Sequence, residues 1–349
     1  MNKFSEAYDK ARSTVDTEKF AVDAVEKLRT NLKEALAQDG PASGKGDVLN
    51  KYRAALVAAM PNGASNRSKA IAEVIANAAN AAARTPARAA TLKMLKHFYC
   101  EPMGKQEIWI YAPPKSYAKW VFDELDGTAD QALKAKLEKD DEVYSQAHRG
   151  LMATAVSKAR EAALHAVAKL GEPDDDTKAM IKKYFADEDT KDADTTAIAS
   201  TLLDGYKKIA AACNSNQLIF SDEPLDRNSG GWKDWAFVYS TEAMRVVYLQ
   251  GAWLSKAEEA TDTNKSPLWR CARTIVHELS HKEVKTKDVA YGPSGLKPAK
   301  ASLTAALALI NADSWAYFAI DLKGQLGAVD KANPLTSPLK SQLVGAYKG

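Results

Sequence analysis

The sequence predicts a mainly α-helical fold with a small β-sheet, an α+β protein. Apolar residues recur at spacings of three and four along much of the chain, which is the pattern of amphipathic helices. The stretch Glu107–Ala112 is aromatic and rich in β-branched residues, and Pro113 and Pro114 end it, so it is the best strand candidate in the first half. We therefore expect helices to dominate and strands to be few.

Length and composition indicate the domain organisation. A chain of 349 residues with 46% hydrophobic and 27% charged residues is typical of a soluble globular protein and is long enough for two domains. We place the boundary in the turn at residues 126–130. This predicts an α-helical N-terminal domain over residues 1–127 and a second domain over residues 128–349.

Charge and hydropathy exclude two classes of partner. The formal net charge is +3, and acidic and basic residues are interspersed along the chain, so no nucleic-acid partner is indicated. No stretch of about 18 apolar residues occurs, and no membrane span is expected.

The first domain is expected to be a series of helices. One stripe of apolar residues predicts a helix over residues 17–37, and its members are Val25, Leu28, Leu32 and Leu36. Further helices are expected at residues 48–60, in an alanine-rich run ending at Leu95, and at residues 117–125. Gly44 and Lys45 do not form a phosphate loop, because the required upstream glycine and a following Ser or Thr are missing.

The second domain begins with more helices. We expect them at residues 134–142 and 143–170, and the second carries His148 and His165. Those histidines are 17 residues apart, which is not a chelating spacing, so structural or surface roles are favoured. The acidic clusters that follow lack the ligand alternation of calcium loops, and helix N-capping explains them.

The stretch Thr274–His281, TIVHELSH, carries the strongest functional signal. A helix start is expected at Ser266–Pro267, with the hydroxyl as the cap, and apolar residues then recur at helical spacing. His277 and His281 lie on one face of this helix, so both rings can bind one metal ion. Glu278 lies where it can take a proton from a metal-bound water. The alternative is an incidental surface pair of histidines.

The residues after this helix resemble a known family. A zinc hydrolase needs a third protein ligand, and the stretch Lys285–Gly292, KTKDVAYG, resembles the second motif of the aspzincins, the deuterolysin and peptidyl-Lys metalloendopeptidase group. Thr286, Asp288, Tyr291 and Gly292 match Gly-Thr-x-Asp-x-x-Tyr-Gly, and a lysine replaces its first glycine. The resemblance implies that Asp288 is the third zinc ligand and that Tyr291 hydrogen-bonds the developing oxyanion.

Other stretches extend the resemblance. Residues 236–239 and 246–249 resemble the paired strands before the zinc helix of this family, which implies a zincin-like domain. Asn311–Phe318 resembles its Asn-Ala-Asp-Ser-aromatic segment, whose Asp helps to form an acidic pocket for a lysine on the primed side of the cleaved bond in peptidyl-Lys members. Asp313 is therefore a candidate substrate-binding residue, although Ala316 stands at the second acidic position.

Two other acidic residues compete with Asp288 for the metal. Glu283 follows His281 by two residues and lies on the wrong face of the helix. Asp313 is the realistic rival, although a role in the pocket suits it better.

The N-terminus and the cysteines indicate where the protein is made. Residues 1–6 lack an apolar run, so no classical signal peptide is expected. Cys100, Cys213 and Cys271 are too few for an extracellular disulfide scaffold, and Cys271 lies on the apolar face of the zinc helix as a small buried residue. We expect synthesis in a reducing cytoplasm, with export by a specialised secretion system as one option.

These observations predict a zinc-dependent endopeptidase with one catalytic Zn²⁺ and a protein or peptide substrate. A bacterial toxin or effector, with residues 1–127 serving delivery and an export machine or a cognate inhibitor as partner, is one expectation. A housekeeping intracellular protease is another. The alternative from a different class is a helical binding protein with a decayed zinc site, and the presence of all catalytic side chains argues against it.

Overall fold

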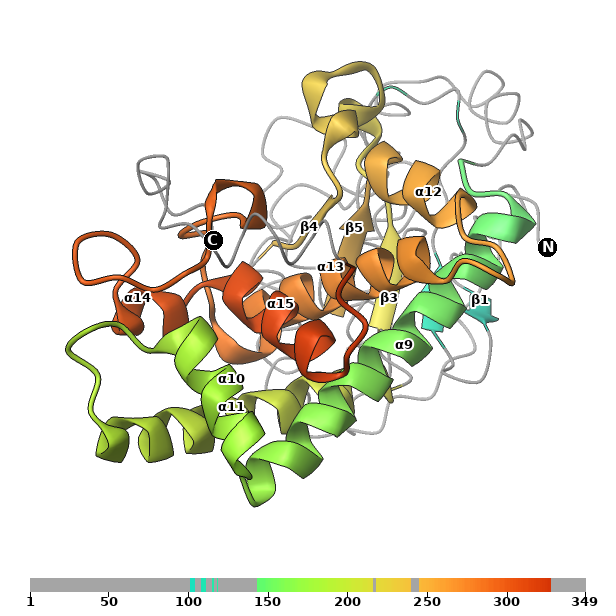
Figure 1. Cartoon of the computed structure of the whole chain (residues 1–349). Coiled ribbons are helices and arrows are strands. Elements are labelled where there is room, and N and C mark those ends of the chain that lie inside the picture. The colour runs from blue at the N-terminus through green and yellow to red at the C-terminus, as the bar shows by residue number, and fades with distance from the viewer. Residues whose placement is uncertain are drawn as a thin grey trace, which may run out of the picture. The chain divides into compact units, whose positions relative to one another are not determined.

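The structure of the protein is a computed structural model that describes residues 101–103, 108–110, 143–215, 218–239 and 245–327, together with residues 115 and 118. These residues are mainly helical with a small amount of β-structure, as the sequence predicts (Figure 1). Several predictions concern residues outside the described ranges, apart from residue 118. They are the helices expected before residue 100, the ends of the strand expected at Glu107–Ala112, the helices expected at residues 117–125 and 134–142, and the domain boundary.

The chain divides into two compact units, and unit 1 includes residues 109–145 and 219–232. Strand β2 (Ile108–Ile110) pairs in parallel with β3 (Leu218–Ser221), so that Trp109 lies opposite Ile219, and both of these residues belong to unit 1. The strand expected near Glu107–Ala112 is thus confirmed over its central part, whereas β3 was not predicted. Two short 3-10 helices follow β3, at Pro224–Asn228 and Gly230–Lys233, and β1 comprises Glu101–Met103.

Unit 2 includes residues 146–218 and 233–349, and its described part holds the expected helix that carries His277 and His281. Its helices are α9 (Gln146–Gly171), α10 (Asp175–Phe185), α11 (Asp192–Cys213), α12 (Gly251–Glu258), α13 (Ser266–Val284), α14 (Ala305–Leu309) and α15 (Ala312–Leu322). Strands β4 (Ala236–Phe237) and β5 (Arg245–Leu249) pair in antiparallel fashion, which confirms the paired strands expected before the helix.

Helix α13 packs against α9, α11 and α15. Alanines on the buried face of α9 let neighbouring helices approach closely, and Gly205 of α11 allows the same, because a Cβ there would lie 2.3 Å from the ring of Trp315. An aromatic cluster fills the space between α10, α11 and α15, and it comprises Tyr184, Phe185, Tyr206, Trp315 and Phe318. The functional face of α13 is therefore held on a rigid core.

The start of α13 differs from the expected one. Ser266 is the first helical residue, not the cap, and Lys265 precedes it without a side-chain cap. The reason is the turn before it, where Asn264 Oδ1 accepts the N–H of Ser266. N-capping by the acidic clusters is confirmed at Asp174, whose side chain accepts the N–H of Thr177.

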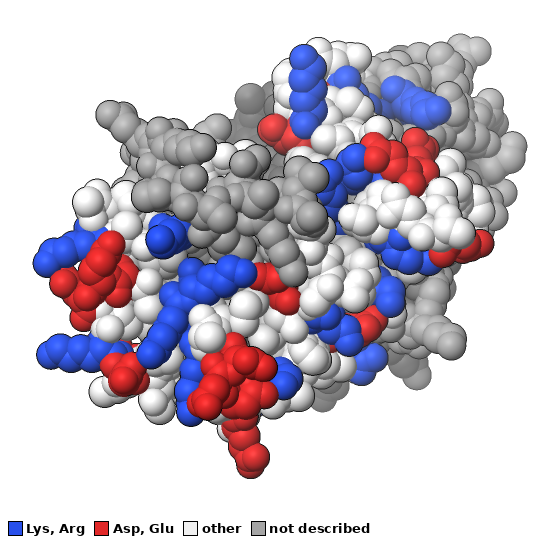
Figure 2. All heavy atoms as spheres, in the orientation of Figure 1, with Lys and Arg blue, Asp and Glu red and all other residues white. Residues whose placement is uncertain are grey.

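The distribution of surface charge and the burial of two cysteines are consistent with the expectations from the sequence. Basic and acidic side chains are intermixed on the face of the described residues shown in Figure 2. Cys213 and Cys271 are buried and free, and burial raises the pKa of each thiol to about 12. No helix among the described residues is long and apolar enough to span a bilayer.

Candidate metal centre

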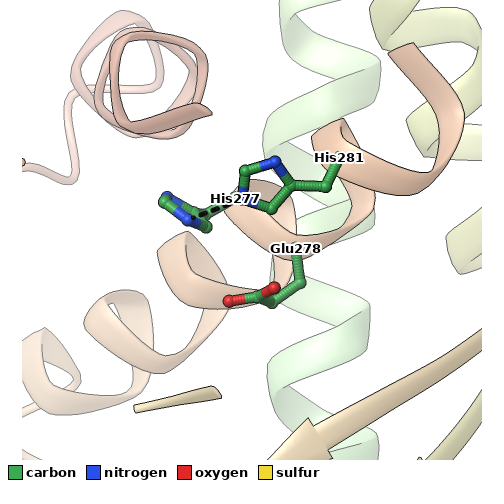
Figure 3. A group of neighbouring side chains, drawn as sticks. All are labelled: His277, Glu278 and His281. Atoms are coloured by element: carbon green, nitrogen blue, oxygen red, sulfur yellow. Dashed lines mark hydrogen bonds between the residues drawn. The ribbon is translucent and has the colours of Figure 1, made fainter. Parts of the chain in front are cut away.

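The buried C-terminal half of α13 presents the three residues that the sequence singles out. His277, Glu278 and His281 direct their side chains to one side of the helix (Figure 3). Nε2 of His277 lies 3.1 Å from Nε2 of His281. His277, Glu278 and His281 form a group of His, Cys, Asp or Glu side chains close enough together to hold a metal ion.

The turn after α13 orients His281. Lys285 adopts left-handed backbone angles, with φ 68° and ψ 35°, and the Thr286 N–H then donates to the carbonyl of Ser280. This reversal brings the Thr286 carbonyl to 2.8 Å from Nδ1 of His281. The hydroxyls of Ser280 and Thr286, 2.6 Å apart, fix the turn further.

Asp288 completes a set of three donor atoms. Its Oδ1 lies 3.1 Å from Nε2 of His277 and 3.4 Å from Nε2 of His281. This oxygen is buried, yet it has a hydrogen bond to neither ring nor to any other donor. Bonds of about 2.0–2.2 Å to a tetrahedral zinc ion place ligand atoms roughly 3.3–3.6 Å apart, close to the 3.1–3.4 Å observed here. The triangle of two nitrogens and one orphaned oxygen therefore fits zinc.

Asp313, at the start of α15, contacts the other side of the His277 ring. Its Oδ1 lies 2.7 Å from Nδ1 of His277, and its Oδ2 accepts the N–H of Gly292. Because a carboxylate and a carbonyl only accept, Nδ1 carries the proton in both His277 and His281. When both rings are neutral, they direct their Nε2 lone pairs at the shared position beside Asp288.

The charges of the site are strongly coupled. Burial raises the pKa of the Glu278 carboxyl, although the two histidines oppose this shift. Burial also opposes ionisation of Asp288, but His277 and His281 outweigh it and hold the pKa of Asp288 well below its ordinary value. In His277, Asp288 and Asp313 overcome the effect of burial and raise the pKa of the ring. The carboxylates around the two rings therefore favour a positive charge at this position, as the binding of a metal cation requires.

Tyr291 lies at the edge of the site and is 44% exposed. Its ring stacks on that of His277, with 6.4 Å between centroids and 16° between planes. Burial of the phenol and the charge of Asp288 raise its pKa above the ordinary value, so the hydroxyl stays protonated and can donate a hydrogen bond. The next residue, Gly292, has no side chain and so leaves room for Tyr317, because a Cβ at position 292 would lie 2.1 Å from the hydroxyl of Tyr317.

The rival ligands are engaged elsewhere. Glu283 accepts hydrogen bonds from the guanidinium of Arg245, as its position on the wrong face predicts. Asp313 reaches His277 through Nδ1 rather than Nε2, so the geometry favours Asp288 as the third ligand. Ala316 is fully buried. The sequence pattern indicates no role for Ser280 or Asn311, although each lies within one of the motif stretches.

A known protein family matches the part of the chain that contains the metal centre. Residues 171–320 match the aspzincin family model, which is described as a lysine-specific metallo-endopeptidase. The match covers the elements from α10 to residue 320 in α15, and with them all the residues of the metal centre. A search of curated proteins gave no match.

Proposed function

We propose that this chain, whose residues 171–320 belong to the aspzincin family of metalloendopeptidases, is a zinc-dependent endopeptidase that cleaves peptide bonds at the centre formed by α13 and the loop after it. One observation carries the proposal. Two Nε2 atoms and the orphaned Oδ1 of Asp288 converge at separations that match a tetrahedral zinc site.

Each residue of the centre has its own role in the proposed reaction. His277, His281 and Asp288 would hold the metal, and Glu278 would accept a proton from the attacking water and return it to the leaving amine. The raised pKa of Glu278 suits this exchange, because a base with a pKa nearer neutrality also donates well. Tyr291 donates its phenolic hydrogen to the oxyanion that forms at the scissile carbonyl. A bound zinc ion would supply Lewis acidity, which makes water nucleophilic near neutral pH.

A preference for lysine on the primed side of the cleaved bond is proposed in a weak form. The negative charge of Asp313 supports it. However, both oxygens of Asp313 already bond to His277 and Gly292, and Ala316 provides no second carboxylate. Cleavage sites in a mixture of unstructured peptides should therefore show only modest enrichment of lysine, and cuts confined to lysine would contradict this proposal.

The ligand set is tested by zinc content. Wild type should bind one zinc ion, lose its peptidase activity to a chelator and regain it on addition of zinc. Asp288→Asn should bind zinc far more weakly. Glu283→Gln is the matched control, because Glu283 is a nearby carboxylate that bonds to Arg245 instead. Equal zinc affinity in Asp288→Asn and wild type would remove Asp288 from the ligand set.

The biological setting stays a prediction from the sequence. A toxin or effector role, delivery by residues 1–127, and export from the cytoplasm are proposals that accompany the peptidase. A cognate inhibitor that binds the wild-type protein and blocks cleavage would support the toxin role.

A further inference from the structure

The side chain of Asn311, at the start of α15, does not cap its own helix. The residue occupies the N-cap position, where an asparagine side chain ordinarily accepts an N–H from the first turn of its own helix. Here the side chain makes no such bond, and the residue is fully buried. A buried amide that does not cap its helix must satisfy its polar atoms elsewhere.

The side-chain amide of Asn311 bonds instead to the loop that carries Asp288. Its Oδ1 accepts the N–H groups of Val289 and Ala290, each at 3.0 Å, and its Nδ2 donates to Oγ of Ser314 at 2.9 Å. The backbone adds a second attachment next to it. Lys287 donates its N–H to the carbonyl of Ile310 and accepts the N–H of Ala312, so the two segments form a parallel bridge.

These attachments bracket Asp288 in the chain. The bridge holds Lys287 on one side of Asp288, and Asn311 Oδ1 holds Val289 and Ala290 on the other side, up to the residue before Tyr291. The loop from residue 285 to residue 291 contains no helix or ladder of its own, so its path depends on such external acceptors.

We propose that Asn311 is a positioning residue that places Asp288 for the metal and Tyr291 for the substrate. The inference rests on the proposed function for the roles of those two side chains. Asn311 touches neither the metal position nor the substrate, and it acts through the backbone on which both side chains stand. Removal of its oxygen leaves two inward-facing N–H groups without their acceptor, and the loop shifts to find water or another partner.

The test compares Asn311→Ala with Ser314→Ala in the full chain. The first variant removes the shared acceptor. The second, the matched control, removes only the partner of Nδ2 and leaves the bonds to Val289 and Ala290. For each folded variant, circular dichroism checks the fold, chelator competition gives the zinc Kd, and peptide cleavage gives kcat and KM. Hydrogen exchange reports the amides of residues 289 and 290.

Asn311→Ala should bind zinc about 10–100-fold more weakly and lose kcat by a similar factor with little change in KM. Its amides at residues 289 and 290 should exchange faster, and Ser314→Ala should stay close to wild type in all three measurements. If Asn311→Ala does not fold, Asn311→Gln keeps the amide but displaces it, and it should weaken zinc binding as well.

The overturning result is a folded variant at position 311 that keeps the zinc Kd, kcat and amide protection of wild type. The proposed function fails separately, when wild type itself binds no zinc. Amide exchange still decides the inference in that case, since unchanged exchange at residues 289 and 290 in Asn311→Ala would show that Asn311 does not hold the loop.

Discussion

Asp313 Oδ1 accepts a hydrogen bond from Nδ1 of His277, with 2.7 Å between the two atoms. The opposite edge of the same ring faces Asp288. We therefore propose that Asp313 acts on the metal position through the orientation and basicity of His277, in the way that carboxylates behind metal-binding histidines generally do. The resemblance alone places this residue in a substrate pocket, and the hydrogen bond gives it a second role.

Asp313→Asn should lower kcat/KM about 10–100-fold on every peptide, with or without lysine, because an amide cannot accept from both His277 and Gly292. Asp321→Asn is the control, since Asp321 is a buried carboxylate of the same helix that bonds to Lys183 and Tyr184. The control should lower stability but leave zinc affinity unchanged. A loss restricted to lysine-containing peptides would instead assign Asp313 to the pocket alone.

Tyr291→Phe should lower kcat about 100–1,000-fold, the usual cost of losing one donor to an oxyanion, while zinc binding stays stoichiometric. Tyr239→Phe serves as the control, because Tyr239 is 45% exposed and Tyr291 is 44% exposed. Kinetics and zinc content are measured on both variants. If Tyr291→Phe retains the wild-type kcat, the phenol does not stabilise the transition state.

Lys285→Gly should raise the free energy of unfolding by about 1 kcal/mol, because a left-handed conformation costs a residue with a Cβ roughly 1–2 kcal/mol and glycine loses part of that gain to chain entropy. Lys285 is the only non-glycine residue with positive φ in the described part of the chain. Lys287→Gly, at negative φ, should destabilise instead. Urea denaturation measures both, and a less stable Lys285→Gly would refute the assignment of strain.

Asp187 should make stability depend on pH. The N–H of Ala305, at the start of α14, donates to the Asp187 carboxylate and lowers the pKa of that carboxyl below its ordinary value. Burial opposes this shift, and the hydroxyl of Thr190 adds to it. A depressed pKa in the folded state adds stability above the unfolded pKa, and that stability is lost as pH falls through the folded pKa. The difference in Tm between wild type and Asp187→Asn should thus shrink from about pH 6 to about pH 3. A difference that is constant with pH would contradict this linkage.

The sequence predicts the parts of this site that depend on periodicity and motif. His277, Glu278 and His281 follow from helical spacing, and Asp288 follows from the resemblance. The role of Asn311 could not be predicted, because it depends on which backbone N–H groups the folded loop leaves without acceptors. The same holds for the Thr286 carbonyl that orients His281, since only the left-handed turn at Lys285 brings it there.

The fold shows a similar division. The bounds of α9 and the start of α13 were predicted to within a few residues, since several turns of apolar periodicity define each helix. Strand β3 was missed because four buried residues in a row, Leu218–Ser221, have no alternation to reveal them. The cap of α13 was misplaced because Asn264, not Ser266, sets the turn before the helix.

The most direct test of the metalloendopeptidase is a comparison of wild type with Glu278→Gln for zinc content and for cleavage of an unstructured, lysine-containing protein. Glutamine preserves the shape of the side chain but cannot take a proton from water. Wild type should bind one zinc ion and cleave, whereas Glu278→Gln should bind the same zinc and cleave at least about 100-fold more slowly. Equal cleavage by both proteins, or a wild type that binds no zinc, would contradict the account.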